Sequence, residues 1–210
     1  VSLAQKLGFS EYDRVLLLHA DDMGLTPETN TAVRQVIDFG MVRSASILIP
    51  APGARDAIQN YSDLDLGIHL ELTSEWDDYR WGPISDPDEV SSIVSPCHSE
   101  GFLYQRREPL WLFGRTRDVK RELEAQIEEA LRLGLKPTHM DSHMGTVFLK
   151  KRWGRAYLKL SKKYQIPPMI VRWSDHLADQ LPPFVMNHLK EESEKAEEAG
   201  FLLFDYILMG

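Results

Sequence analysis

Short apolar runs alternate with longer amphipathic stretches along the chain, and this alternation is typical of repeated strand–helix units. The first run, Arg14–His19, is almost continuously apolar, as expected for a parallel strand that is buried on both faces. Five further strands are expected at Ser44–Pro50, Leu64–Leu72, Pro137–His143, Pro168–Trp173 and Phe201–Leu208. The pattern therefore predicts an α/β fold, either a β/α barrel or a doubly wound sheet.

The amphipathic stretches predict the helices between these strands. Thr26 is a typical N-cap with Pro27 at the first helical position, and the helix that follows is expected to end near Phe39. The clearest helix is Arg117–Leu133, whose apolar side chains recur on one face and which stops at Gly134. Other helices are expected at Pro52–Asn60, Lys151–Tyr164 and Met186–Ala199.

Residues 73–116 show neither helical nor strand periodicity. Pro, Gly and Asp are interspersed there with seven aromatic side chains, Trp76, Tyr79, Trp81, Phe102, Tyr104, Trp111 and Phe113. An irregular segment of this length inside a compact domain usually serves a function, or else indicates that its secondary structure has been assigned wrongly. We interpret it as an elaborated loop after the third strand, with some local structure.

The length and the even composition predict a single domain, residues 1–210, because no linker, low-complexity stretch or internal repeat divides the chain. Six strands do not complete a barrel. We therefore expect C-terminal strands to be missing, through truncation or because the barrel is intrinsically incomplete.

Composition narrows the range of partners. With 24 Lys and Arg against 32 Asp and Glu, the net charge is −8, which disfavours binding to nucleic acid. The single cysteine, Cys97, excludes a disulfide framework and a cysteine-based zinc site. The sequence has neither an apolar stretch of about 18 residues nor the apolar core of a secretory signal. We expect a cytoplasmic protein without a membrane partner, and assembly into a homo-oligomer stays open.

Three polar clusters lie where an apolar strand gives way to a loop. They are Asp21 with Asp22, His69 with Glu71, and His139 with Asp141 and His143. Because the carboxyl ends of parallel strands open onto one face, the three clusters are expected to converge on one site. In the third cluster, residues two and four apart share one face of a strand, so both of its imidazoles can reach one point.

Two histidines and a carboxylate are a suitable ligand set for a hydrolytic metal ion. Such an ion lowers the pKa of a bound water to about 7 and polarises a carbonyl group. A second carboxylate beside it can accept the proton of the water, and the adjacent Asp21 and Asp22 could divide these two roles. Taken alone, the acidic pair is an ordinary turn device and His69 an ordinary core-edge residue. Only the combination of the three clusters predicts a divalent-metal centre.

At these clusters the sequence resembles the YdjC/ChbG family of carbohydrate deacetylases. The matching stretches are His19–Leu25, Gly67–Thr73 and Pro137–His143, in this order, with Arg43–Ser46 as a weaker match. The resemblance covers residues 14–210. It implies a deformed (β/α) barrel of the polysaccharide-deacetylase type, and removal of acetyl groups from a small N-acetylglucosamine-containing carbohydrate.

The resemblance also implies residue roles. Asp22, His69 and His143 would bind the divalent metal ion, zinc or magnesium, and Asp21 would be the general base. It selects His143 rather than His139 as the ligand from the third cluster. The candidates for orienting these ligands or contacting substrate are then His139, Asp141 and Glu71. The candidates for stacking on sugar faces are Trp76, Trp81 and Trp111, each of which is otherwise explained as packing for the long loop.

Two features depart from the family pattern. Met144–Phe148 follows the third motif where many members have further histidines. No histidine is followed by proline, although members usually carry such a pair near the C-terminus as the acid for the leaving amine. We predict a metal-dependent sugar deacetylase. The alternatives are a metal-dependent hydrolase of another amide or a phosphoester, and a non-catalytic sugar-binding barrel.

Overall fold

The structure is a computed structural model that describes residues 2–97, 99–174 and 183–208, with the backbone alone for residues 183–188. Its sheet has four parallel strands, β1 (His19–Met23), β2 (Ser44–Leu48), β3 (Leu66–Leu70) and β4 (Met140–Ser142). The strands pair in chain order, so each new strand lies beside the previous one. A parallel sheet with helices between its strands confirms the predicted α/β class.

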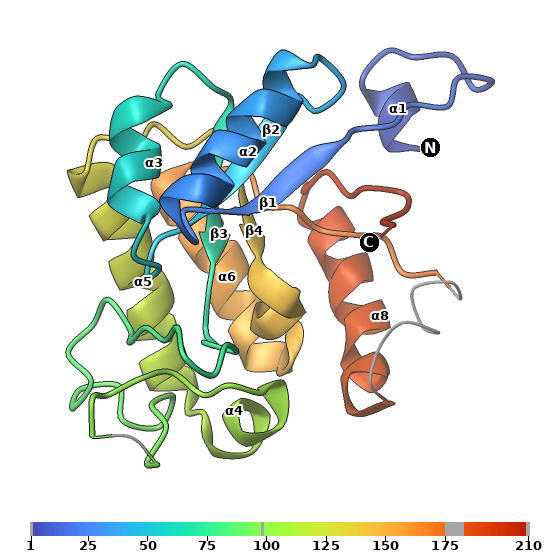
Figure 1. Ribbon diagram of the computed structural model, residues 1–210. Coiled ribbons are helices and arrows are strands. Elements are labelled where there is room, and N and C mark those ends of the chain that lie inside the picture. The colour runs from blue at the N-terminus through green and yellow to red at the C-terminus, as the bar shows by residue number, and fades with distance from the viewer. Residues whose placement is uncertain (1, 98, 175–182, 209–210) are drawn as a thin grey trace.

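Helices connect the strands and cover the sheet (Figure 1). The described helices are α1 (Leu3–Lys6), α2 (Pro27–Asp38), α3 (Ala54–Asn60), α4 (Arg107–Phe113), α5 (Thr116–Arg132), the 3₁₀ helix η1 (His143–Phe148), α6 (Lys151–Tyr164) and α8 (Pro183–Glu198). Helix α2 packs against α3, α5 against α6, and α6 against α8, so the helices follow one another around the strands. Within the described ranges, no helix combines the length and apolarity that a membrane crossing requires.

The starts and faces of the helices agree with the sequence pattern. The Thr26 hydroxyl accepts the N–H of Thr29, and Pro27 occupies the first position of α2. The predicted apolar face of α5 is buried at Val119, Leu123, Ile127 and Ala130, each 0% exposed, whereas Leu131 at its end is 42% exposed. The capping residues in the sequence and the burial of apolar side chains therefore favour the same helices.

The first strand lies further along the chain than its apolar run predicts. A strand at Arg14–His19 is wrong, because β1 begins at His19 and the preceding residues have no strand pairing. Val15, Leu16 and Leu17 are 52%, 73% and 50% exposed. The paired segment is instead the polar one, His19–Met23, and the His19 ring also bonds to the hydroxyls of Ser44 and Ser46 on β2.

The last two predicted strands are present only as single parallel bridges. Met140 of β4 bridges to Pro168, and Val171 bridges to Phe204. The parallel order thus continues past β4 in both expected segments, but the pairing is too short to count as a strand. Closure of a barrel and the single-domain assignment stay predictions.

The long segment 73–116 has more structure than its sequence pattern predicts. It contains α4, and it is fastened to α5 by two buried acids. Glu122 accepts the backbone N–H groups of Ile84 and Ser85, each at 2.9 Å. Asp118 accepts the hydroxyl of Ser92 at 2.7 Å. These bonds hold the loop against α5.

Candidate metal centre

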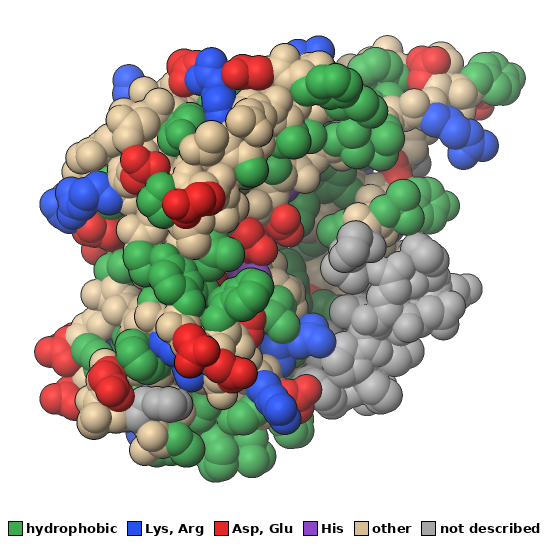
Figure 2. Space-filling view, viewed as in Figure 1, with side chains coloured by type: hydrophobic (Ala, Val, Ile, Leu, Met, Phe, Trp, Pro, Cys, Tyr) green, Lys and Arg blue, Asp and Glu red, His purple; other side chains and the backbone are tan. Residues whose placement is uncertain are grey.

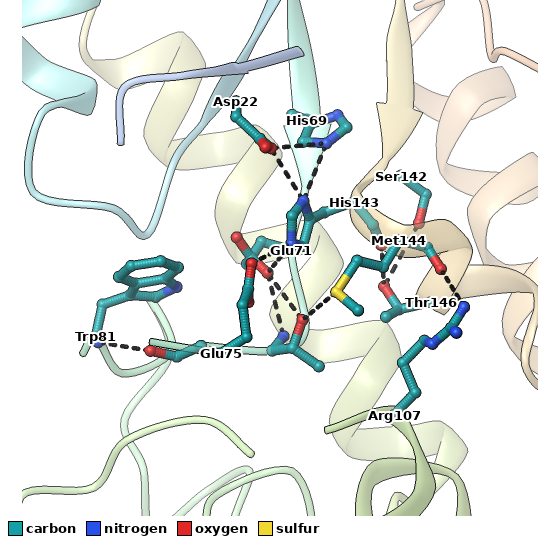
Figure 3. A network of polar contacts seen from close by, with 12 residues as sticks. Asp22, His69, Glu71, Glu75, Trp81, Arg107, Ser142, His143, Met144 and Thr146 are labelled. Carbon is teal, nitrogen blue, oxygen red and sulfur yellow. Dashed lines mark hydrogen bonds and ion pairs between the residues drawn. The ribbon is translucent and has the colours of Figure 1, made fainter. Parts of the chain in front are cut away.

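Asp22 reaches the centre from an irregularity in β1. The register between β1 and β2 shifts between Ala20 and Met23, which is the behaviour of a bulge. Asp22 has a φ of 57°, in the left-handed region that residues with a side chain rarely adopt. This backbone turn directs its carboxylate toward the ends of β3 and β4 (Figure 3).

His69 and His143 lie at the ends of the neighbouring strands. His69 is the fourth residue of β3, and His143 follows β4 directly as the first residue of η1. Both are almost fully buried, whereas the side chain of Asp22 is 39% exposed. Figure 2 shows acidic side chains and a histidine together in a hollow near the middle of the molecular face.

The three side chains converge on one point. Asp22 Oδ1 lies 3.0 Å from His143 Nδ1 and 3.3 Å from His69 Nε2, and the two nitrogens are 3.3 Å apart. Donor atoms held at about 2.0–2.1 Å from one divalent ion stand roughly 3.0 Å apart in an octahedron and roughly 3.4 Å apart in a tetrahedron. The triangle is therefore a possible metal-binding group of the right dimensions for a single divalent ion.

Carboxylates surround both imidazoles and govern their pKa values. Burial alone would lower the pKa of His69, but the Asp141 carboxylate raises it to about 10. Burial likewise acts to lower the pKa of His143, and bonds to Asp22 and Glu75 raise it to about 11. The same negative potential that retains protons on the metal-free histidines also attracts a cation, which would displace those protons.

Asp22 and Asp141 stay ionised, although burial alone would favour their neutral forms. Burial acts to raise the pKa of Asp22, but bonds to His143 and His69 hold it well below its usual range. Burial also acts to raise the pKa of Asp141, but the charge of His69 and the bonds to His19 and His69 together outweigh that effect and hold the pKa well below its usual range.

Asp141 connects His69 to a polar layer beneath the centre. Its Oδ1 lies 2.7 Å from His69 Nδ1. Its Oδ2 accepts the Ser46 hydroxyl at 2.9 Å and lies 3.3 Å from His19 Nε2. His69 therefore presents Nε2 to the centre while Nδ1 bonds to a fixed carboxylate.

Glu71 and Glu75 lie on the other side of His143 (Figure 3). His143 Nε2 is 2.7 Å from Glu75 Oε1 and 3.6 Å from Glu71 Oε1. Glu71 is fully buried, and this burial raises its pKa to about 8. Sequence reasoning singled out Glu71 but missed Glu75, because Glu75 falls in the segment without periodicity. The only available signal was its position four residues after Glu71.

His139 lies apart from the three converging side chains. It precedes β4, its Nδ1 lies 2.8 Å from the Thr138 hydroxyl, and its ring meets the ring of His19 edge to face at 5.1 Å. His139 and His143 were expected to share one face of a strand, but β4 runs only from Met140 to Ser142, and η1 begins at His143. Of the two histidines in the third cluster, only His143 joins Asp22 and His69 in the described structure.

Asp21 adjoins Asp22 in the same irregular part of β1 and is exposed. Its side chain makes no hydrogen bond or ion pair with the described residues of the centre. Its assignment as the general base stays a prediction.

The three candidate tryptophans differ in exposure. Trp81 is 4% exposed and belongs to the core, and Trp111 packs partly buried against it. Trp76 is 53% exposed on the loop after β3. In the same loop, the Tyr79 hydroxyl donates to the carbonyl of Leu25 at 2.9 Å, which joins the loop to the segment that follows Asp22.

The sequence is similar to known proteins over nearly its whole length. The family model described as "YdjC-like protein" matches residues 15–207. A carbohydrate deacetylase of Thermus thermophilus is 33% identical over 185 residues, covering 88% of this chain and 63% of that protein. A carbohydrate deacetylase of Thermoanaerobacter pseudethanolicus is 33% identical over 158 residues, covering 73% of this chain and 59% of that protein. The chain thus spans about three fifths of the length of these curated relatives.

A solved structure supports the fold. The crystal structure of an Enterococcus faecalis V583 protein, named as a candidate cellobiose-phosphate cleavage protein, matches with a TM-score of 0.65 at 21% sequence identity. The match covers 90% of this chain and 96% of that one.

Proposed function

The chain belongs to the YdjC-like protein family, and from that membership we propose that it removes acetyl groups from N-acetylated sugars with the help of a divalent metal ion. The observation that carries the proposal is the triangle of Asp22, His69 and His143, whose donor atoms lie 3.0–3.3 Å apart. The curated relatives named as carbohydrate deacetylases support the reaction class.

Asp22, His69 and His143 would hold the ion. Two imidazole nitrogens and one carboxylate suit Zn²⁺ better than Mg²⁺, which prefers oxygen ligands and water. A divalent ion in this position would supply a Lewis acid for the acetamide carbonyl and would acidify an attacking water.

Asp21 is proposed to accept the proton of that water, because it adjoins Asp22 and its side chain is exposed. Attack on the carbonyl carbon forms a new C–O bond, and the C–N bond then breaks to give acetate and the free amine. The amine nitrogen gains a proton from a group that we leave unassigned. Trp76, exposed on the adjoining loop, would stack on a sugar face of an N-acetylglucosamine-containing substrate.

Acetate release by metal-stripped protein tests the proposal. N-acetylated oligosaccharides are supplied with and without added zinc or magnesium, and release of acetate is expected only with metal.

Substitutions separate the metal ligands from the base. Asp22→Ala and His143→Ala should lose metal binding and activity together. Asp21→Asn should keep metal binding but lose activity by roughly 10²–10⁴-fold, the usual contribution of a general base. Full activity of Asp21→Asn would exclude Asp21 as the base, and metal-restored hydrolysis of a phosphoester alone would point to the other hydrolase class.

A further inference from the structure

We propose that Glu75 is a positioning residue for His143: it fixes the tautomer that turns the lone pair of Nδ1 toward the metal, and so raises metal affinity. This inference rests on the proposed function, because it requires that His143 binds a metal ion. Glu75 would act through His143 and would not itself contact the ion or the substrate.

The contacts on the two nitrogens of His143 differ. Nε2 lies 2.7 Å from Glu75 Oε1, which is a strong hydrogen-bond distance. Nδ1 lies 3.0 Å from Asp22 Oδ1 and 3.3 Å from His69 Nε2. A neutral imidazole carries one proton, so it can donate at one nitrogen and offer a lone pair at the other.

Only one tautomer satisfies both sides. With the proton on Nε2, His143 donates to the Glu75 carboxylate and leaves Nδ1 free to bind an ion between Asp22 and His69. With the proton on Nδ1, the hydrogen would point into the proposed metal position, and the Nε2 lone pair would face the carboxylate oxygen of Glu75. The charge of Glu75 therefore selects the metal-binding form.

The arrangement repeats the one at His69. There Asp141 Oδ1 lies 2.7 Å from Nδ1, and Nε2 faces the centre. Each proposed imidazole ligand thus has a carboxylate on its outer nitrogen, at the same distance. Acids that support metal-binding histidines in this way typically change metal affinity 10–100-fold when they are removed.

The neighbouring Glu71 is less suited to this role. Its Oε1 lies 3.6 Å from His143 Nε2, beyond hydrogen-bond distance, and already accepts the N–H and the hydroxyl of Thr73. Glu71 therefore fills the space beside His143 without fixing its proton.

Glu75 lies on a loop, yet the residue before it is firmly held. The Ser74 N–H donates to the Tyr104 carbonyl at 2.8 Å, and the Ser74 hydroxyl accepts the Trp81 N–H at 3.0 Å. Ser74 is fully buried, whereas the Glu75 side chain is 29% exposed. Because the exposed Trp76 follows directly, the same short segment joins the outer side of the metal centre to the surface proposed for sugar.

Zinc titration of the metal-stripped chain, combined with NMR of the histidine side chains, tests this role. The long-range ¹H–¹⁵N couplings of zinc-loaded protein report which nitrogen of His143 carries the proton. We expect the Nε2–H form in the wild type. Glu75→Ala should bind zinc about 10–100-fold more weakly, and Glu75→Gln, which keeps an oxygen acceptor, should lie between the two.

Asp78→Asn is the matched control, because Asp78 is an exposed acid of the same loop. This variant loses the same charge and should bind zinc within about twofold of the wild type. Circular dichroism of each metal-free variant reports its fold, and the isosteric Glu75→Gln decides the matter if Glu75→Ala does not fold.

The outcomes separate the two proposals. A wild-type chain that binds neither zinc nor magnesium would overturn the proposed function itself. A wild-type chain that binds zinc, with Glu75 variants of equal affinity and an unchanged His143 tautomer, would overturn the role of Glu75 and leave the metal centre standing. An equal loss in Asp78→Asn would also overturn it, by reducing the effect to net charge.

Discussion

Asp22 carries its carboxylate on a backbone that costs free energy. Its φ of 57° lies in the left-handed region, which disfavours a residue with a side chain by about 1–2 kcal/mol. The residue that follows His143 has a similar geometry, since Met144 has a φ of 49°. Strained backbone on both sides of the triangle is typical of a site whose surroundings over-determine it.

A comparison of two substitutions at Asp22 measures this strain. Asp22→Gly and Asp22→Ala both remove the carboxylate and should both abolish metal binding. In metal-free protein, however, glycine adopts a positive φ without a steric penalty. Asp22→Gly should therefore be more stable than Asp22→Ala by about 1 kcal/mol in chemical denaturation. Equal stabilities of the two variants would show that the backbone at position 22 leaves the left-handed region once the carboxylate is removed.

A second prediction concerns the close approach of His139 to β3. A Cβ on Gly67 would stand 2.7 Å from Cε1 of the His139 ring and closer still to two other ring atoms. Gly67→Ala should therefore displace the imidazole and destabilise the fold by about 1–3 kcal/mol. The double variant with His139→Ala should recover much of that loss, as measured in a double-mutant cycle.

Gly154→Ala is the control for this cycle. Gly154 lies inside α6, and the nearest atom to an added Cβ is 3.6 Å away, which is ordinary contact. Alanine there should stabilise the protein by about 0.5–1 kcal/mol, because it favours the helix. An additive cycle at Gly67 and His139 would contradict the predicted overlap.

The residues of the centre were predictable to different degrees. Asp22, His69 and His143 lie at or just after the carboxyl ends of strands, and the rule that parallel strand ends share one face brings them together. Their assignment as ligands stays a prediction. Glu75 was not predictable, because its position depends on how an irregular loop returns to the site. His139 was wrongly expected to converge with His143, because the change from strand to 3₁₀ helix at His143 cannot be read from spacing.

At the scale of elements, the long loop is held in place by hydrogen bonds to two buried acids on α5, Asp118 and Glu122. Burial alone would raise the pKa of Asp118, but bonds from the Ser92 hydroxyl and Arg117 outweigh it and lower the pKa below the usual 3.8. Asp118 also lies in the first turn of α5, where a negative charge is favoured by the helix dipole. Both effects stabilise the fold only while Asp118 is ionised.

Asp118→Asn should therefore destabilise the protein at pH 7 by about 1–3 kcal/mol. A folded-state pKa below the unfolded one contributes stability that is present above the unfolded value and is lost as the pH falls through the folded value. The difference in free energy of unfolding between wild type and Asp118→Asn should thus narrow as the pH falls below 3.8. Urea denaturation across this range measures it, with the exposed Asp78→Asn as control. A difference in unfolding free energy that stays constant with pH would mean that Asp118 stabilises the fold through packing and not through its charge.

The predictability of the elements follows from where their side chains are buried. Helix α5 was predicted to within a residue at each end, because its apolar face is buried against the fold. Strand β1 was misplaced, because it carries His19, Asp21 and Asp22 in place of an apolar run, and its His19 ring bonds to hydroxyl groups of β2, while the apolar run before it stays exposed. Hydrophobic pattern alone cannot identify a strand whose inner face is polar.

At the scale of the whole molecule, the proposed ligands join parts of the chain that are far apart in sequence. Asp22 belongs to β1, His69 to β3 and His143 to the start of η1. The backbone already aligns β1 to β4, so the metal-free chain should keep its fold. An ion bound by all three side chains is nevertheless absent from the unfolded chain, and its binding free energy then adds to stability.

Thermal unfolding should therefore depend on metal concentration. At 100 times the dissociation constant, binding to the folded state alone adds about 2.7 kcal/mol. For a chain of this size, about 1 kcal/mol shifts Tm by roughly 2–4 °C, so saturation with zinc should raise Tm by roughly 5–10 °C. His143→Ala should show no such shift, and chelation should reverse it in the wild type. A Tm that rises equally in both proteins would place the ion elsewhere on the chain. A Tm that falls when the ion is added would mean that it binds the unfolded chain more tightly than the triangle.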